Sequence, residues 1–308
     1  MHPAISVIFF TVTSGAGFGL IAMIGVGAPM SQGPLAAFLI SLLAGGLAVA
    51  GLISSTFHLG HPERAWRAFS QWRSSWLSRE GVLAVATLFL FGVYVLFWLF
   101  AGNRPLWLGV LIAFLAIVTV VATAMIYTQL RTVPHWNSIL TPLVYVGFAI
   151  ACGYVAAAAL NPETNSSDRA TIAGMACLVL IVAWALKMSW WHRAGRTSLA
   201  AVGSTPETAT GLGAIGRVRL LESPHSGENY LTREMVHVIG RKHAAKLRAI
   251  ALTTGFAAPL LISLAVAISG GPLAWLGVAF VCLIAGLFVE RWLFFAEARH
   301  AVSLYYGR

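Results

Sequence analysis

Long apolar runs alternate with polar connections along almost the whole chain. Hydropathy marks eight runs, at 4–27, 35–57, 81–101, 106–126, 140–160, 171–186, 249–268 and 272–295. Each is near the ~20 residues that cross a hydrocarbon core of about 30 Å, and before Glu290 they hold no charged residue. The pattern predicts an all-α polytopic integral membrane protein with eight transmembrane helices. We expect one membrane domain over residues 1–308, with a long loop at about 190–248.

Positive charge lies almost entirely on one set of connections. Eighteen of the twenty Lys and Arg residues fall with the two termini and the second-to-third, fourth-to-fifth and sixth-to-seventh connections. The opposite side keeps Arg104 and Arg169. By the positive-inside rule, the side rich in Lys and Arg is cytoplasmic. The sequence therefore predicts that both termini and the long loop face the cytoplasm.

Composition supports this class. Hydrophobic residues make up 58% of the chain and charged residues 10%, and the mean hydropathy is +0.81, which leaves too little polar surface for a soluble globule. The net charge of +10 lies in loops beside the membrane. Attraction to anionic lipid or to an acidic partner explains it more simply than binding to nucleic acid. A nucleic-acid partner is not expected.

The residues that usually bind metals are poorly placed for a resident metal site. All three cysteines lie in apolar runs without CxxC spacing, and none of the nine histidines lies in the middle of a span. A membrane cytochrome b needs histidine pairs within its helices. We expect no haem, iron–sulfur cluster or other metal in this chain, so any electrons must pass through a partner or a diffusible carrier.

The connection between the second and third spans holds the first candidate site. His58 is expected to end the second helix, which Gly60 and Pro62 stop. Ser78 is expected to cap the third helix and to place Glu80 in its first turn. The imidazole of His58 and the carboxylate of Glu80 can then meet at one membrane depth. Ionisable groups that border hydrocarbon cost free energy, so they are often functional. The structural alternative is that Glu80 pairs with an arginine and His58 bonds to backbone.

Further candidates lie on the same side of the membrane. Tyr127 and Trp136 flank the connection after the fourth span, which also contains Arg131. Such aromatic residues often form an interfacial belt. A flat aromatic or quinoid ring entering from the bilayer would need an apolar slot with donors at its mouth, and these three residues can supply one. Arg64 is ambiguous, because arginines that flank a helix commonly extend toward water.

The third polar connection is too long for a turn. Residues 200–216 are rich in Gly, Ala, Ser and Thr and are expected to be flexible, whereas 222–235 are denser in side chains suited to binding. The run YLTRE at 230–234 echoes WLSRE at 76–80. Shared helix-capping chemistry produces such an echo without duplication.

Three motifs together resemble a known family. The run HLGHPERAW, then SWLSRE, then RTVPHWNSILTP is similar to the membrane anchor subunit of bacterial dimethyl sulfoxide reductase and its relatives. The resemblance covers the eight-helix plan and most of the chain. It implies a haem-free subunit of the bacterial inner membrane that anchors a molybdopterin catalytic subunit and an iron–sulfur subunit. These partners would dock on the side that carries the motifs, and the charge distribution makes that side cytoplasmic. Those partners hold the molybdopterin and the clusters, and the anchor exchanges electrons with a quinone, ubiquinone or menaquinone.

The resemblance also implies roles for single residues. It places the quinone-associated histidine on His58 and the acidic residue of an LSxE element on Glu80. We therefore expect these two residues to be catalytic in proton exchange. The expected quinone pocket comprises His58, Arg64, Glu80, Tyr127, Arg131 and Trp136. In it, the arginines would offset negative charge that develops on the quinone oxygens.

Orientation favours one branch of the family. Docking of the soluble subunits in the cytoplasm is what a resemblance to the sulfite dehydrogenase complex implies. We therefore expect an anchor that passes electrons from sulfite oxidation to quinone. The alternative is the anchor of a dimethyl sulfoxide or other oxyanion reductase that oxidises quinol. A purely structural anchor and a small-anion transporter remain open. A transporter would require charged or discontinuous helices near the midplane, and the spans show almost nothing of the kind. A proton pump would require buried carboxylates along a path, which the sequence does not predict.

Overall fold

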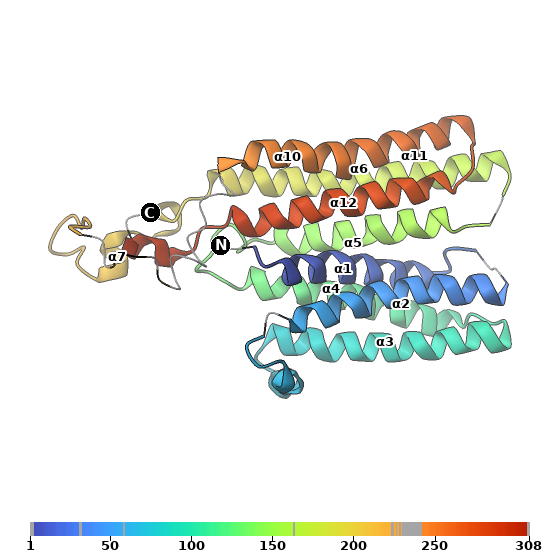
Figure 1. Ribbon diagram of the computed structural model, residues 1–308, viewed down its shortest axis with the longest axis horizontal. Coiled ribbons are helices and arrows are strands. Elements are labelled where there is room, and N and C mark those ends of the chain that lie inside the picture. The colour runs from blue at the N-terminus through green and yellow to red at the C-terminus, as the bar shows by residue number, and fades with distance from the viewer. Residues whose placement is uncertain are drawn as a thin grey trace.

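A computed structural model describes residues 3–30, 33–57, 59–162, 164–222, 225, 227, 229 and 242–306 (Figure 1). In this part of the chain, eight helical spans are long and apolar enough to cross a membrane, and no strand is present, which confirms the predicted fold class. The first six spans are α1 (Ile5–Gly25), α2 (Pro34–Thr56), α3 (Trp76–Ala101), α4 (Leu106–Thr128), α5 (Leu140–Ala159) and α6 (Ser166–Arg196). The seventh comprises α10 (Ala244–Leu252), the π-helical turn η3 (Thr253–Ala257) and α11 (Ala258–Ser269), and the eighth is α12 (Trp275–Ala296).

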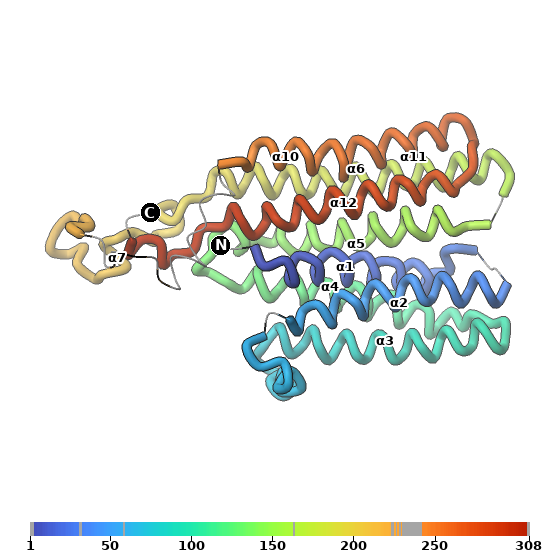
Figure 2. The backbone as a smooth tube through the Cα atoms, viewed as in Figure 1, coloured from blue at the N-terminus to red at the C-terminus, as the bar shows by residue number. Residues whose placement is uncertain are grey.

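The helices run side by side along one axis, and both termini lie at the same end (Figures 1 and 2). It also holds the connections at 57–75, 129–139 and 197–243. We call it the basic end, because these connections, the helix ends beside them and the C-terminal segment together carry eighteen of the twenty Lys and Arg residues. The first of these connections contains η1 (Pro62–Gln71), a 3₁₀ helix. Short turns join the helices at the opposite end.

Helix α1 holds the two halves of the bundle together. It packs on α2 and α4 of the first half (α1–α4) and on α5 and α12 of the second half (α5–α12). At the crossing of α1 and α5, Gly19 lies directly on the backbone of Ala149, and Gly153 lies on the backbone of Gly19. A side chain at either glycine would overlap that backbone, so small residues permit the close approach, as is common between membrane helices.

The seventh span is held to its neighbours at its π-helical turn. Gly255 in this turn packs against Gly286 of α12, and the indole Nε1 of Trp184 donates a hydrogen bond of 2.8 Å to the carbonyl of Gly255. A π turn leaves backbone carbonyls poorly matched within the helix. The bond from Trp184 therefore satisfies one of them and fixes the position of the seventh span on α6.

Several elements extend beyond their apolar runs. Helix α6 has 31 residues and continues through Lys187, which the apolar run at 171–186 placed in a loop. The segment expected to be flexible contains η2 (Ala200–Val202) and α7 (Pro206–Thr210), whose start is closed by a capping box on Thr205. The hydroxyl of Tyr305, in η4 (Ala301–Tyr306), donates a hydrogen bond of 2.7 Å to the carbonyl of Ala209. Regular structure at 200–216 therefore exceeds what composition suggested, while the run at 230–234 lies outside the described residues.

Candidate functional site

Polar residues gather within roughly two helical turns of the basic end. Glu80 lies four residues from the start of α3, which is about 6 Å along the helix axis. Tyr145 lies five residues into α5, and Arg291 lies five residues before the end of α12. These groups lie inside the spans rather than in the loops.

Glu80 is buried against α4 in the first half. Its side chain is 4% exposed, and its Oε1 accepts a short hydrogen bond from the hydroxyl of Thr123. Helix α3 begins at Trp76 and is capped by Ser75, so the expected cap at Ser78 is wrong and Glu80 lies in the second turn. Glu80 therefore lies farther from the positive end of the helix dipole than expected.

An aromatic cluster adjoins Glu80. Tyr127 from α4 contacts Trp136 edge to face at 5.5 Å and stacks on Tyr145 at 6.0 Å between ring centroids. Phe294 and Phe295 of α12 complete the cluster at 5.8 and 5.4 Å from Tyr127. Glu80 lies within electrostatic range of both tyrosines. The cluster thus joins the first half of the bundle to the second at the depth of Glu80.

The structure gathers some of the predicted site residues and separates others. Trp136 is 2% exposed, stacks on Phe294 at 5.3 Å, and donates its indole hydrogen to the Phe294 carbonyl at 3.0 Å. Arg64 is exposed on η1, where its Nε lies 3.7 Å from Glu63, and Arg131 is exposed in its turn. His58 lies outside the described residues. Glu80, Tyr127 and Trp136 are therefore close together, with both arginines nearer to solvent.

A second buried cluster, which we call the Glu290 cluster, lies in the second half. Glu290 of α12 pairs with Lys187 of α6 and, through its other oxygen, with Arg291 Nε at 2.7 Å. Lys187 and Glu290 are fully buried, and Arg291 is 3% exposed. The predicted runs already included Glu290 and Arg291, near the end of the eighth, but they placed Lys187 in a loop, whereas the structure buries it inside α6. Two cations surround one carboxylate, so the cluster carries a formal charge of +1.

Aromatic faces stabilise the two cations. Lys187 Nζ lies 4.0 Å from the ring centroid of Trp190, and the Arg291 guanidinium lies 4.1 Å from that of Tyr145. Such cation–π contacts gain strength when the charge is removed from water. The sequence did contain a signal for Lys187, because Trp184 and Trp191 stand three residues before it and four after it, on one helix face.

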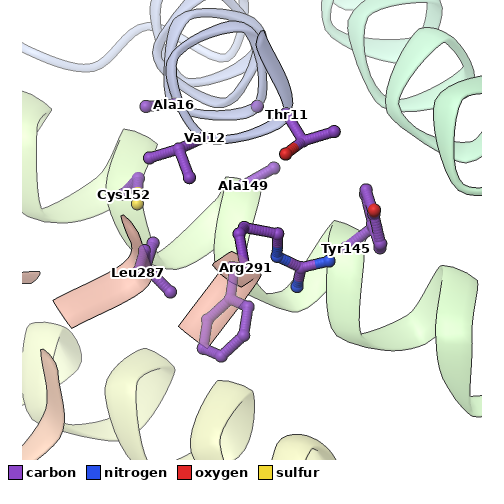
Figure 3. Close-up of a pocket in the computed structure, with 10 residues that line it drawn as sticks. Thr11, Val12, Ala16, Tyr145, Ala149, Cys152, Leu287 and Arg291 are labelled. Atoms are coloured by element: carbon purple, nitrogen blue, oxygen red, sulfur yellow. The ribbon is translucent and has the colours of Figure 1, made fainter. Parts of the chain in front are cut away.

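The Glu290 cluster reaches a small cavity between the two halves. Arg291 points from α12 toward Tyr145 and Thr11 (Figure 3). The cavity, also lined by Cys152 and Leu287, has a volume of about 20 Å³, enough for about one water molecule. Tyr145 thus borders the cavity and also stacks on Tyr127, so ring contacts link the cavity to the aromatic cluster.

Outside the spans, burial changes the charge behaviour of two groups near the end of α12. Burial raises the pKa of Glu297, although the nearby Arg248 guanidinium opposes the shift. Burial also lowers the pKa of His300. Among the described residues, no group of three or more His, Cys, Asp or Glu side chains is arranged to hold a metal ion.

Comparison with known proteins places the chain in a family. A family model described as DMSO reductase anchor subunit (DmsC) matches residues 1–307. A sulfite dehydrogenase subunit of Allochromatium vinosum is 35% identical over 331 aligned residues, which cover 99% of each chain. Two Escherichia coli proteins, anaerobic dimethyl sulfoxide reductase chains YnfH and C, are 31% and 36% identical over 46% and 30% of this chain, and over 53% and 33% of their own lengths. No solved structure matches the chain.

The eight spans and the full-length matches define a multi-pass membrane anchor subunit of a redox enzyme complex. More particularly, the chain belongs to the DMSO reductase anchor subunit family, as its motifs suggested.

Proposed function

We propose that this subunit exchanges electrons with a quinone, ubiquinone or menaquinone, beside Glu80, and that it passes electrons from sulfite oxidation on partner subunits to that quinone. The observation that carries the proposal is Glu80 itself, a buried carboxylate whose hydrogen-bond partner is the neutral hydroxyl of Thr123. An ionisable group held at membrane depth by a neutral partner is costly, so its presence suggests a role in chemistry.

The surrounding residues suit a flat, mostly apolar ligand. Tyr127 is half-buried and belongs to the aromatic cluster that adjoins Glu80, so it can form one wall of the site. Trp136 supports that wall from behind, since its indole N–H is already bonded to Phe294. His58 follows Phe57, the C-cap of α2, and α2 packs beside α3. Arg64 and Arg131 would stand at the mouth of the site.

The proposed chemistry divides between the ligand and the chain. A quinone takes up two electrons and two protons on reduction. An imidazole titrates near neutral pH, so His58 is suited to donate a hydrogen bond and deliver a proton. Glu80 would orient His58 or relay protons from the basic end. The positive charge of Arg64 and Arg131 would favour negative charge on the bound oxygens.

Partners and orientation follow from the basic end. We propose that it faces the cytoplasm and docks an iron–sulfur subunit and a molybdopterin catalytic subunit. Electrons and protons would then enter from the same side, so no net charge would cross the membrane in this subunit. Full-length similarity to a sulfite dehydrogenase subunit supports the sulfite assignment.

Orientation can be tested directly. A reporter fused after Arg308 should give a cytoplasmic signal, because the connections near the basic end hold most of the Lys and Arg residues. Paired alkaline phosphatase and fluorescent protein fusions would measure it, with a fusion inside the 102–105 turn as the matched control for the opposite side. A periplasmic signal after Arg308 would overturn the orientation and the preference for sulfite oxidation.

The quinone site is tested by His58→Ala in the assembled complex. Quinone-linked turnover should fall on the order of 10²-fold, the usual scale for losing a positioned proton donor, while activity of the soluble subunits with an artificial dye should persist. His61→Ala is the matched control, because His61 lies in the same connection but is exposed and bonded to Glu63 at 2.9 Å. Parental quinone turnover in His58→Ala across pH 6 to 9 would disprove the role.

A second candidate is an anchor of a dimethyl sulfoxide reductase, which oxidises quinol instead. The partial matches to the two Escherichia coli chains favour it. The purified complex separates the two candidates. Sulfite-dependent quinone reduction supports the first, whereas quinol-dependent reduction of dimethyl sulfoxide, without sulfite oxidation, supports the second.

A further inference from the structure

A separate, larger pocket lies at the basic end of the second half, outside the residues proposed to bind quinone. Its volume is about 330 Å³. It lies where α6 ends and α10 begins, beside the turn before α5 and the segment after α12 (Figure 1). The lining residues are His135, Trp190, Ala194, Gly195, Arg196, Thr197, Ser198, Ala244, Arg248, Glu297 and Arg299.

The pocket has a surplus of positive charge. Three guanidinium groups line it with one carboxylate, Glu297, so the formal charge is +2 with histidine neutral. Arg248 pairs with Glu297 at 2.8 Å, which leaves Arg196 and Arg299 without a carboxylate in the lining. Guanidinium groups carry several N–H donors on a fixed plane, which suits a phosphate. The pocket therefore has both surplus positive charge and donors for an anion.

Backbone groups add to this preference. Ala244 is the first residue of α10, and its N-cap, His243, makes no side-chain capping bond. The start of α10 therefore borders the pocket, and the positive end of its helix dipole lies beside it. The end of α6 presents carbonyls of opposite polarity, but Arg193 and Arg196 in its last turn offset them.

The position of the pocket indicates what kind of anion binds there. Most of its lining residues lie at the end of α6, the start of α10 and just after α12. The adjoining helices carry exposed apolar side chains, such as Met188 on α6 and Ile250 on α10. A phosphate in the pocket could thus belong to a molecule whose acyl chains lie along these helices. Basic pockets between helices at a membrane surface commonly bind anionic lipid headgroups.

We propose that this pocket binds the phosphate group of an anionic phospholipid. Arg196, Arg248 and Arg299 hold the phosphate, beside the positive end of the α10 dipole. Trp190 forms the floor, and its ring also faces Lys187 at 4.0 Å. The bound lipid thereby joins α6, α10 and α12 at the surface above the Glu290 cluster.

The test uses the full-length chain, purified in detergent and depleted of lipid. Thermal unfolding is measured with added phosphatidylglycerol, phosphatidylcholine or inorganic phosphate. Phosphatidylglycerol should raise the midpoint at low concentration, while phosphatidylcholine should not. The double variant R196Q/R299Q should need on the order of tenfold more phosphatidylglycerol for the same shift, because each arginine near an anionic lipid contributes to binding.

The control is R217Q/R219Q, which removes two exposed arginines of the same end that do not line the pocket. This control should respond to phosphatidylglycerol as the parent does. An equal loss in both double variants would show general charge attraction and overturn the proposal. It would also fail if inorganic phosphate matched phosphatidylglycerol at equal concentration, or if phosphatidylcholine shifted the midpoint equally.

Discussion

The two halves of the bundle each bury a glutamate near the basic end, but in opposite electrostatic settings. Glu290 lies between two cations, Lys187 and Arg291, so its charge is more than balanced. Glu80 has the neutral hydroxyl of Thr123 as its partner. A buried carboxylate with matched cations is held in one charge state by its surroundings. A carboxylate with a neutral partner has no adjacent cation to hold it in the charged form. Glu80 is therefore better suited than Glu290 to exchange a proton.

The two glutamates also differ in how many helices their contacts join. The Glu290 cluster joins α6 to α12 and reaches α5 through the ring of Tyr145. Glu80 and Thr123 join only α3 and α4, which also contact through Thr87 and Thr119 at 3.2 Å. Loss of Glu290 would leave cations stranded in the core, whereas loss of Glu80 strands none. We therefore expect the second half to respond to mutation mainly in stability and the first half mainly in turnover.

The largest effect is expected for Glu290→Ala. It should lower the free energy of unfolding by about 3–5 kcal/mol, the usual cost of leaving buried charges uncompensated. Thermal unfolding of the detergent-solubilised chain would measure the loss. Adding Lys187→Met should recover part of it, because one stranded cation is removed. The contrast between the halves would fail if Glu290→Ala cost no more stability than Glu80→Ala.

Glu80→Gln should have the next largest effect, on turnover rather than on stability. The amide keeps the shape of the side chain but cannot relay a proton, so quinone-linked turnover should fall on the order of tenfold, by an amount that changes between pH 6 and 9. Unfolding should stay near parental. The exposed Glu63→Gln serves as the control for charge in the same region. An unchanged rate and pH profile would make Glu80 a structural residue.

Sequence alone predicted the spans well and their polar ends poorly. Apolar runs locate the eight helices within a few residues, apart from α6, because hydrocarbon demands a continuous apolar stretch whatever the packing. The same criterion ended the sixth span at 186, since hydropathy excludes Lys187, although the helix continues to Arg196. Pairing with Glu290 makes that lysine tolerable inside, and the nearby Trp184 and Trp191 indicate a buried face but cannot identify a partner on a distant helix. The close approach of Gly19 and Gly153 likewise depends on tertiary contact.

The candidate site shows the same division. Motifs located Glu80, Tyr127 and Trp136, and the structure brings these residues together. Sequence could not show that Thr123 is the partner of Glu80, nor that the N–H of Trp136 is already used. Those facts depend on how α3, α4 and α12 pack, which spacing along one chain does not encode.

The smallest effect is expected for Trp136→Phe, which tests whether this residue belongs to the quinone site or to the wall behind it. The change keeps a ring on Phe294 but removes the 3.0 Å hydrogen bond and leaves a buried carbonyl unpaired, so unfolding should become easier by about 1 kcal/mol. The control is Trp98→Phe, because Trp98 is equally buried and its Nε1 has no hydrogen-bond partner among the described residues. If Trp136 only supports Tyr127, thermal unfolding should separate the two variants while the KM for quinone stays near parental in both. A large rise in KM in Trp136→Phe alone, with unchanged unfolding, would instead place the indole against the ligand.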